Sequence, residues 1–232
     1  DCLDLPDKVY MPRLVELTPQ QQKAYDEMKR EAMAIIGNDV INVTTVLSQI
    51  TKLHQIVCGF ILNSQGEATE IENNRYQTLL DVLEEAGDQK IVIWANYRYD
   101  IKKILKTIRE KYGFKSIKAF FGDTKDQDRQ DIVTEFQDPG SELRYIIANP
   151  RTAGYGLTLT LAHTVVYFSN SYDLEIRIQS EERVHRIGQT KKVTYIDLLT
   201  PKTVDEKIIK SLRKKINISS EVLGEELKDW IV

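Results

Sequence analysis

Five short apolar runs, separated by amphipathic helical patterns, constrain the fold of this chain more than any other feature. Val, Ile and aromatic residues dominate the runs, as is typical of strands buried on both faces. They occupy residues 90–95, 116–121, 143–149, 163–169 and 192–199. Strands that alternate with helices predict a parallel sheet with right-handed crossovers and helices on both faces.

The helices between these runs are predicted from apolar residues three and four positions apart. We expect them at residues 75–86, 101–112, around 132–136 and 173–187. A further helix is expected after Thr203, where Thr203 and Glu206 form a capping pattern.

The first third of the chain has a different character and is mostly helical. Thr18-Pro19-Gln20-Gln21 is a capping box with proline at the first helical position, and Gly37 can end that helix. A second helical pattern covers 43–57, and the short run at 60–62 before Asn63-Ser64-Gln65-Gly66 predicts a small hairpin. We therefore expect residues 1–70 to form a helical leading segment with a β-hairpin, and residues 71–232 to form the α/β lobe.

Composition excludes several classes of protein. The 232 residues include no apolar run of about 18, so no membrane association is expected. Cys2 and Cys58 lie far apart without metal-ligand spacing, which favours a reducing compartment: the cytoplasm, or the nucleus in a eukaryote. The chain starts at Asp1 without a leader pattern, and we expect it to be a piece of a longer protein.

The net charge of −3 does not indicate a nucleic-acid-binding protein, but charge is unevenly distributed. Residues 98–118 contain eight Lys or Arg and only two acidic residues, Asp100 and Glu110. This stretch is either a solvated helix face or a surface for phosphates.

Ligands of open parallel sheets bind beyond the carboxyl ends of the strands. The loops that follow four of the predicted strands are polar, glycine-containing or aromatic. They start at Asn96, Gly122, Pro150 and Asn170.

Three polar residues stand out in the helix predicted after Asp173. Gln179, Arg183 and Arg186 are spaced i, i+4, i+7, which would place them on one helix face. Guanidinium groups bind phosphate oxygens and stabilise the charge of phosphoryl transfer. An ion-pair network with Glu175 and Glu182 is the alternative reading.

Two features of the loop after residue 149 can likewise be interpreted either as phosphate-binding or as purely structural. The Gly154-Tyr155-Gly156 turn would let backbone N–H groups approach a phosphate, or it is an ordinary tight turn. Thr152 could bind a phosphate or cap a short helix.

No G-x-x-x-x-G-K-[ST] phosphate loop occurs in the chain, and no Asp-Glu pair directly follows a predicted strand. Phosphate-binding arginines without a phosphate loop indicate half of a composite ATP site.

Several motifs together resemble one family. Residues 179–189 are similar to the last helicase motif, Q-x-x-x-R-x-H-R-I-G-Q, of the Swi/Snf-type branch of superfamily 2. Thr152–Leu159 resembles the motif before it, and Lys90–Tyr97 resembles the first strand of the second RecA-like lobe. The resemblance extends to residues 5–8, 17–19, 52–56 and 122–136, and is strongest to compact viral or bacterial members and annealing helicases.

The resemblance implies a RecA-like second lobe of a DNA-dependent ATPase: a hydrolase in the whole protein and inactive alone. Arg183 and Arg186 match the arginine fingers, and Gln179, Gly154 and Gly156 match nucleotide-cleft positions. The positions matched to DNA-backbone contacts are Asn96, Arg98, Arg129 and Thr152. His54 stands where many relatives have Arg.

The implied partners are double-stranded DNA, bound through its phosphates, and an N-terminal helicase lobe of the same polypeptide. The implied cofactors are ATP and Mg²⁺, with the Mg²⁺ ligands on that N-terminal lobe. Two other readings stay open: a non-catalytic nucleic-acid or protein-binding module, and an unrelated phosphate-binding α/β enzyme.

Overall fold

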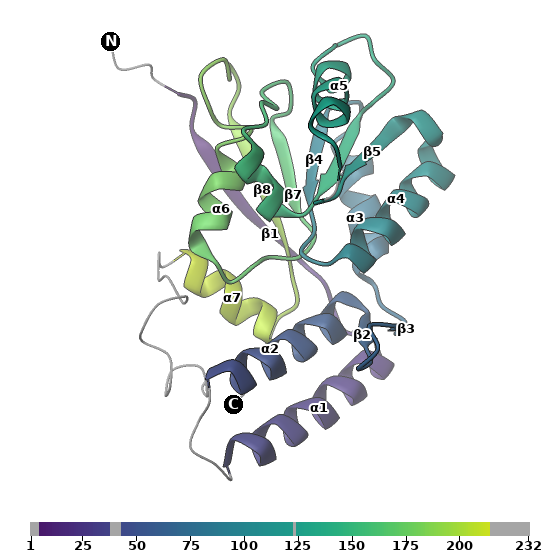
Figure 1. Cartoon of the computed structure of the whole chain (residues 1–232), viewed down its shortest axis with the longest axis vertical. Coiled ribbons are helices and arrows are strands. Elements are labelled where there is room, and N and C mark those ends of the chain that lie inside the picture. Colours follow the sequence, from purple (N-terminus) through teal and green to yellow (C-terminus); the bar gives the residue numbers. More distant parts are fainter. Residues whose placement is uncertain (1–4, 38–42, 123, 214–232) are drawn as a thin grey trace. The chain divides into compact units, whose positions relative to one another are not determined.

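The computed structural model describes residues 5–37, 43–122 and 124–213 (Figure 1). The chain forms two compact units, each assembled from two stretches of sequence. The first contains Asp1–Arg13 and Gln77–Leu198, and the second contains Leu14–Tyr76 and Leu199–Val232. Among the described residues, no helix is both long and apolar enough to span a lipid bilayer.

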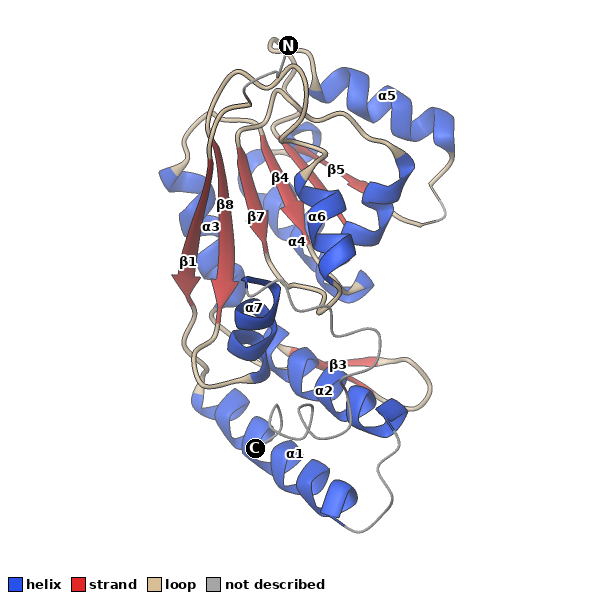
Figure 2. Cartoon of the chain, turned by 90° about the vertical axis from the view of Figure 1, so that its left-hand side faces the viewer, coloured by secondary structure: helices blue, strands red, loops and turns tan. Residues whose placement is uncertain are grey.

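A six-stranded sheet is the centre of the first unit, and its strand order is β1-β8-β7-β4-β6-β5. Neighbours β8, β7, β4, β6 and β5 pair in parallel, and Figure 2 shows β1 pointing the same way as β8. The strands are β1 (Lys8–Leu14), β4 (Ile91–Trp94), β5 (Ile117–Phe120), β6 (Tyr145–Ala148), β7 (Thr164–Tyr167) and β8 (Val193–Leu199). The five predicted strands and the parallel α/β class are confirmed.

Strand β1 was not predicted from the sequence. It lies at the edge of the sheet, most of its residues are exposed, and Pro12 lies within it. An edge strand with little burial has no apolar pattern to detect, and proline is tolerated only at such edges.

Helices cover both faces of the sheet. Tyr112 of α4 (Arg98–Tyr112) contacts the ring of Tyr145, and Ser180 of α6 (Leu174–Glu181) hydrogen-bonds Tyr167. Tyr145 and Thr164 both pair in register with Ile91 of β4, and Tyr167 lies three residues after Thr164, so the two tyrosines point to opposite faces. Helix α5 (Asp126–Phe136) packs on the face of Tyr167, through Val133 and Phe136. Helix α3 (Arg75–Glu85) precedes β4.

The second unit contains helices α1 (Pro19–Gly37), α2 (Val43–Cys58) and α7 (Val204–Arg213) and the antiparallel hairpin β2 (Phe60–Leu62) and β3 (Ala68–Glu70). The capping box is confirmed, because Thr18 and Gln21 exchange side-chain and backbone hydrogen bonds, each 3.2 Å long. The predicted hairpin and both helices are also confirmed.

A buried ion pair, with a histidine beside it, joins distant parts of this unit. Arg75 pairs with Asp205 with both side chains fully buried, and the imidazole of His54 lies 3.6 Å from the other carboxylate oxygen. Burial would raise the pKa of Asp205, but Arg75 and His54 hold it below its usual value. His54 is therefore a buried side chain of this unit.

One helix ends earlier than predicted. Helix α6 ends at Glu181, whereas the sequence predicted a helix to Ile187. Beyond it, Val184 is buried in the core, and the carbonyl of Arg183 accepts a hydrogen bond from the Leu159 N–H. Tertiary contacts thus replace helical ones, and Gln179, Arg183 and Arg186 do not share a helix stripe as predicted.

Candidate phosphate and nucleic-acid sites

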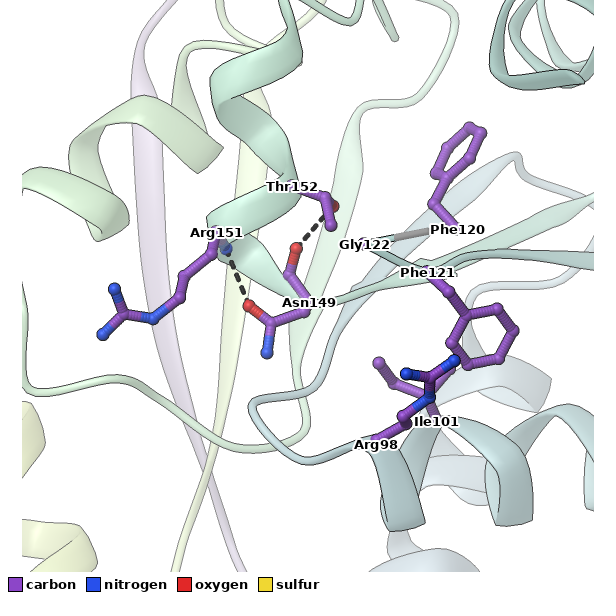
Figure 3. Close-up of a pocket in the computed structure, with 8 residues that line it drawn as sticks. All are labelled: Arg98, Ile101, Phe120, Phe121, Gly122, Asn149, Arg151 and Thr152. Carbon is purple, nitrogen blue, oxygen red and sulfur yellow. Dashed lines mark hydrogen bonds between the residues drawn. The ribbon is translucent and has the colours of Figure 1, made fainter. Parts of the chain in front are cut away.

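A cavity of about 300 Å³ lies at the carboxyl ends of β4, β5 and β6, where the sequence predicted a site (Figure 3). We call it the strand-end pocket. Among the described residues, two arginines and no acidic residue line it. The lining consists of Arg98, Ile101, Phe120, Phe121, Gly122, Asn149, Arg151 and Thr152.

The two arginines occupy different sides of this pocket. The Arg98 guanidinium lies 5.2 Å from the centre of the Phe121 ring, within cation–π range. Arg151, which the sequence analysis did not select, extends away from that ring, on the other side of Asn149 (Figure 3). Its position directly after Asn149-Pro150 at a strand end is the signal that would have identified it.

Asn149 fixes the floor of the pocket. Its carboxamide accepts a hydrogen bond from the Arg151 N–H and donates one to the carbonyl of Asn96. Thr152 is buried and donates its hydroxyl proton to the carbonyl of Asn149, 2.6 Å away. The backbone N–H of Asn96 donates to the hydroxyl of Ser169. The side chain of Asn149 caps the short helix η2 (Pro150–Tyr155), and Thr152 lies within that helix.

The Arg129 side chain is buried beside the pocket and is hydrogen-bonded within the chain. Its side chain is only 5% exposed, and its guanidinium donates to the carbonyls of Phe121 and Gly122. It also contacts Asp126. These contacts shape the loop after β5, so Arg129 supports the wall of the pocket from behind.

The basic stretch 98–118 is less positive than its sequence suggests. Lys106, Lys111, Lys115 and Lys118 each pair with a glutamate. These ion pairs favour the interpretation of a solvated surface for most of the stretch. Arg98 at its beginning is the residue that lines the pocket.

Arg183 and Arg186 lie in the segment after α6, residues 182–189, which we call the arginine segment. Both side chains are half-buried. Arg183 donates to the carbonyl of Gln179, and Arg186 donates to the hydroxyl of Thr158 and the carbonyl of Leu157. Within the part of the chain that the structure describes, no carboxylate pairs with either guanidinium.

The predicted ion-pair alternative is therefore not formed. Glu175 accepts a hydrogen bond from Gln179 and not from an arginine. Two guanidinium groups whose partners are neutral keep their full positive charge available to an anion.

The arginine segment and the strand-end pocket lie at opposite ends of the strands. Helix α6 follows β7 and precedes the parallel strand β8, so it returns along the sheet to the amino ends. The two arginines thus lie away from the carboxyl-end loops in which the sequence analysis expected ligands to bind. Residues 149–162 connect the strand-end pocket with the arginine segment. Within them, η2 lines the pocket and packs on α6, and the Thr158 hydroxyl accepts a hydrogen bond from Arg186.

The two predicted glycines lie in this connection. Gly156 has φ of 71° and ψ of 22°, a left-handed conformation that favours glycine. It ends η2, and a Cβ there would meet nothing within 4 Å, so the backbone conformation explains the glycine. Gly154 lies within η2.

A buried polar network that the sequence analysis did not identify surrounds the base of the arginine segment. Arg177 pairs with Asp197 and Glu181 and lies 3.5 Å from the centre of the Tyr167 ring. Glu181 also accepts hydrogen bonds from Lys8 and Tyr10 of β1. Burial would raise the pKa of Glu181, but Arg177 and these hydrogen bonds hold it below its usual value.

Among the described residues, no three His, Cys, Asp or Glu side chains are close enough together to hold a metal ion.

Known proteins resemble both the sequence and the fold. Residues 74–188 match the helicase conserved C-terminal domain. An uncharacterized ATP-dependent helicase of Mycoplasma genitalium is 25% identical over 97% of this chain, and the match covers 22% of that protein. The chromatin structure-remodeling complex subunit snf21 of Schizosaccharomyces pombe is also 25% identical, over 95% of this chain and 20% of its own length.

The SWI2/SNF2 ATPase core of Sulfolobus solfataricus, solved in complex with double-stranded DNA, is 27% identical with a TM-score of 0.77. That match covers 98% of this chain and 51% of the other. The chain spans about a fifth of the length of the curated relatives described above. Equal identity to a bacterial helicase and a yeast remodeller gives no preference for compact bacterial members. The chain belongs to the C-terminal helicase lobes of Swi/Snf-type superfamily 2 ATPases.

Proposed function

We propose that this chain is the second motor lobe of an ATP-dependent DNA translocase. It supplies Arg183 and Arg186 to an ATP site that a separate N-terminal lobe completes. It contacts the DNA backbone through the strand-end pocket. Residues 71–232 supply both sites, and residues 1–70 contribute β1 and the helices α1 and α2.

One observation carries the catalytic part of this proposal. Arg183 and Arg186 lie within three residues of each other, half-buried, and hydrogen-bond only neutral groups within the described part of the chain. Such partners orient the guanidinium groups without neutralising them. A polyphosphate is the natural partner of two oriented positive charges.

The mechanism follows from this arrangement. ATP binds mainly to the other lobe, and closure of the two lobes brings the arginines to the γ-phosphate. There they stabilise the negative charge of the transition state, an effect of about 10³–10⁵ in rate in comparable enzymes. Gln179 lies close to the arginines in the sequence. The η2 turn with Gly154 and Gly156 packs on α6, the helix that leads into the arginine segment. In this proposal, these residues belong to the same nucleotide cleft as the arginines.

Mg²⁺ and the phosphate loop are assigned to the N-terminal lobe. When bound, Mg²⁺ would neutralise part of the charge of the phosphates. The described part of this chain has no group of three ligating side chains for it.

The strand-end pocket is the proposed DNA contact. Arg98 and Arg151 flank it without an acidic neighbour among the described lining residues, which suits a phosphate backbone. Asn96 and Thr152 set the backbone of the pocket floor, and Arg129 holds the loop beside it. Binding of this kind depends on salt and little on sequence.

The test is ATP hydrolysis by the polypeptide that carries both lobes, with and without double-stranded DNA. We expect Arg186→Ala to lower the stimulated rate by about 10³-fold or more. ATP affinity, measured by titration with a fluorescent nucleotide, should change little. Arg30→Ala, on the exposed face of α1, is the matched control and should retain the wild-type rate.

Equal losses of hydrolysis and ATP affinity would contradict the arginine-finger role. Full DNA-stimulated hydrolysis by Arg186→Ala would contradict it as well. Wild-type polypeptide that binds DNA and never hydrolyses ATP would support the non-catalytic binding module instead.

A further inference from the structure

Strand β1 makes three side-chain or backbone contacts with the arginine segment and the residue before it. The ammonium of Lys8 lies 2.9 Å and the hydroxyl of Tyr10 lies 2.7 Å from the same carboxylate oxygen of Glu181. The carbonyl of Pro6, just before β1, lies 2.6 Å from the Nε2 atom of His185. Two of these contacts therefore lie at Glu181, just before the arginine segment, and the third lies at His185 in the middle of the segment.

Glu181 is the junction of these contacts. It is the last residue of α6 and is buried, and its other carboxylate oxygen accepts a hydrogen bond from Arg177. Its carbonyl accepts hydrogen bonds from the N–H groups of Val184 and His185 and from the hydroxyl of Tyr195. The position of Glu181 therefore sets the turn from which Arg183 and Arg186 extend.

The far end of the arginine segment is fixed independently of β1. The carboxamide of Gln189 donates to the carbonyls of Thr160, Ala162 and Val184. Its oxygen accepts from the N–H groups of Thr190 and Lys191. Because core residues hold this end of the segment, the position of the other end depends on its contacts with β1.

We propose that Lys8 and Tyr10 are positioning residues for hydrolysis, which hold Arg183 and Arg186 in place through Glu181. This inference rests on the proposed function of the two arginines. Neither Lys8 nor Tyr10 touches a phosphate in this account. Their removal should displace the guanidinium groups while the fold is retained, because Arg177, Tyr195 and Gln189 still hold the segment.

The geometry predicts a loss of turnover and not of binding. A displacement of about 1 Å far from the reacting atoms can reduce a rate by about 10²-fold. Tyr10→Phe removes one hydrogen bond but leaves a ring to stack on Tyr195, whose centre is 5.3 Å away. Lys8→Met removes the ion pair and leaves a flexible apolar chain, whereas Lys8→Arg restores a charge that can reach Glu181.

The experiment measures DNA-stimulated ATP hydrolysis by the two-lobe polypeptide. We expect the double variant Lys8→Met/Tyr10→Phe to lower kcat by about ten- to hundredfold with unchanged KM for ATP and unchanged DNA affinity. The single variant Lys8→Arg should retain most of the rate. Lys192→Gln is the matched control, because Lys192 pairs with Asp7 beside the same strand, with both side chains exposed and no link to Glu181.

A second measurement separates positioning from folding. In an Arg183→Lys background, the double variant should cause a much smaller further loss, because both changes act on the same group. Full additivity of the two effects would overturn the proposal. So would a wild-type rate in the double variant, or a fall in kcat matched by a fall in the folded fraction.

Failure of this inference is distinguishable from failure of the proposed function. If Arg183→Ala leaves hydrolysis intact, the arginine role itself is wrong. If Arg183→Ala abolishes hydrolysis and the β1 variant is unaffected, only the positioning role of β1 is wrong.

Discussion

The arginine within α6 and the two arginines after it have opposite environments, although ten residues contain all three. Arg177 is buried against Asp197 and Glu181, with Asn170 as a further hydrogen-bond partner. Arg183 and Arg186 are half-buried and donate to carbonyls and one hydroxyl. The comparison shows that the internal partners of an arginine indicate its role better than its place in a motif.

The charges explain the difference. The carboxylates that accompany Arg177 compensate its charge inside the unit, so it stabilises the fold and has little attraction left for a ligand. The charges of Arg183 and Arg186 have no such compensation among the described residues. Each prediction below tests one side of this contrast.

Removal of Arg177 should have the largest effect on stability. Arg177→Ala leaves the buried carboxylates of Asp197 and Glu181 without their main partner, and should lower the free energy of unfolding by about 3–5 kcal/mol. Urea unfolding of the chain, followed by circular dichroism, measures this effect. A loss below about 1 kcal/mol would show that the network around Arg177 contributes little to the fold.

Removal of a pocket arginine should have a smaller effect, and on DNA binding alone. Arg151→Ala should reduce the slope of log affinity against log salt by about 0.9, the value for one phosphate contact. Fluorescence anisotropy with a short duplex at several salt concentrations gives this slope. Lys106→Ala, whose side chain pairs with Glu110, is the control and should leave the slope unchanged. Equal slopes for wild type and Arg151→Ala would remove Arg151 from the DNA contact.

Acid should weaken the network around Glu181. The pKa of this carboxylate is lowered in the folded state, so its contribution is fully present above the unfolded value, about 4.3. It is lost as the pH falls through the lower folded value. The difference in unfolding free energy between wild type and Glu181→Gln should therefore shrink below about pH 4, by at most about 1.4 kcal/mol per pH unit. A difference that stays constant down to pH 2 would contradict this account.

Removal of Arg183 should have the smallest effect on stability. Arg183→Met keeps an apolar chain and loses one hydrogen bond to the Gln179 carbonyl, so the free energy of unfolding should change by less than about 0.5 kcal/mol. The same urea titration as for Arg177→Ala measures it. A loss of several kcal/mol would place Arg183 with Arg177 as a structural residue.

The sequence was sufficient to predict the elements that bury a periodic apolar face. All five buried strands and the helices α1 to α4 were predicted within a few residues, because a buried face leaves a clear apolar pattern. Helix α5 was predicted only from its second half, around 132–136, and begins at Asp126. The edge strand β1 was missed because most of its side chains face solvent. The end of α6 was wrong because Val184 enters the core and distant backbone groups bond the segment after it.

The candidate sites could also be predicted only where the information lies in a local sequence pattern. Residue types and spacing were enough to select Arg183, Arg186 and Thr152 as candidates, whereas Arg98 was selected through the family resemblance. The ion pair that most clearly separates Arg177 from these residues joins it to Asp197 of β8, a strand that follows the arginine segment. No local pattern contains that information.

The most direct test of the central claim is DNA-stimulated ATP hydrolysis by the two-lobe polypeptide with Arg183→Ala. The account predicts a loss of about 10³-fold or more in a protein that unfolds at the wild-type urea concentration. Retention of the stimulated rate within a few-fold would show that the uncompensated charge of Arg183 serves another purpose than ATP hydrolysis.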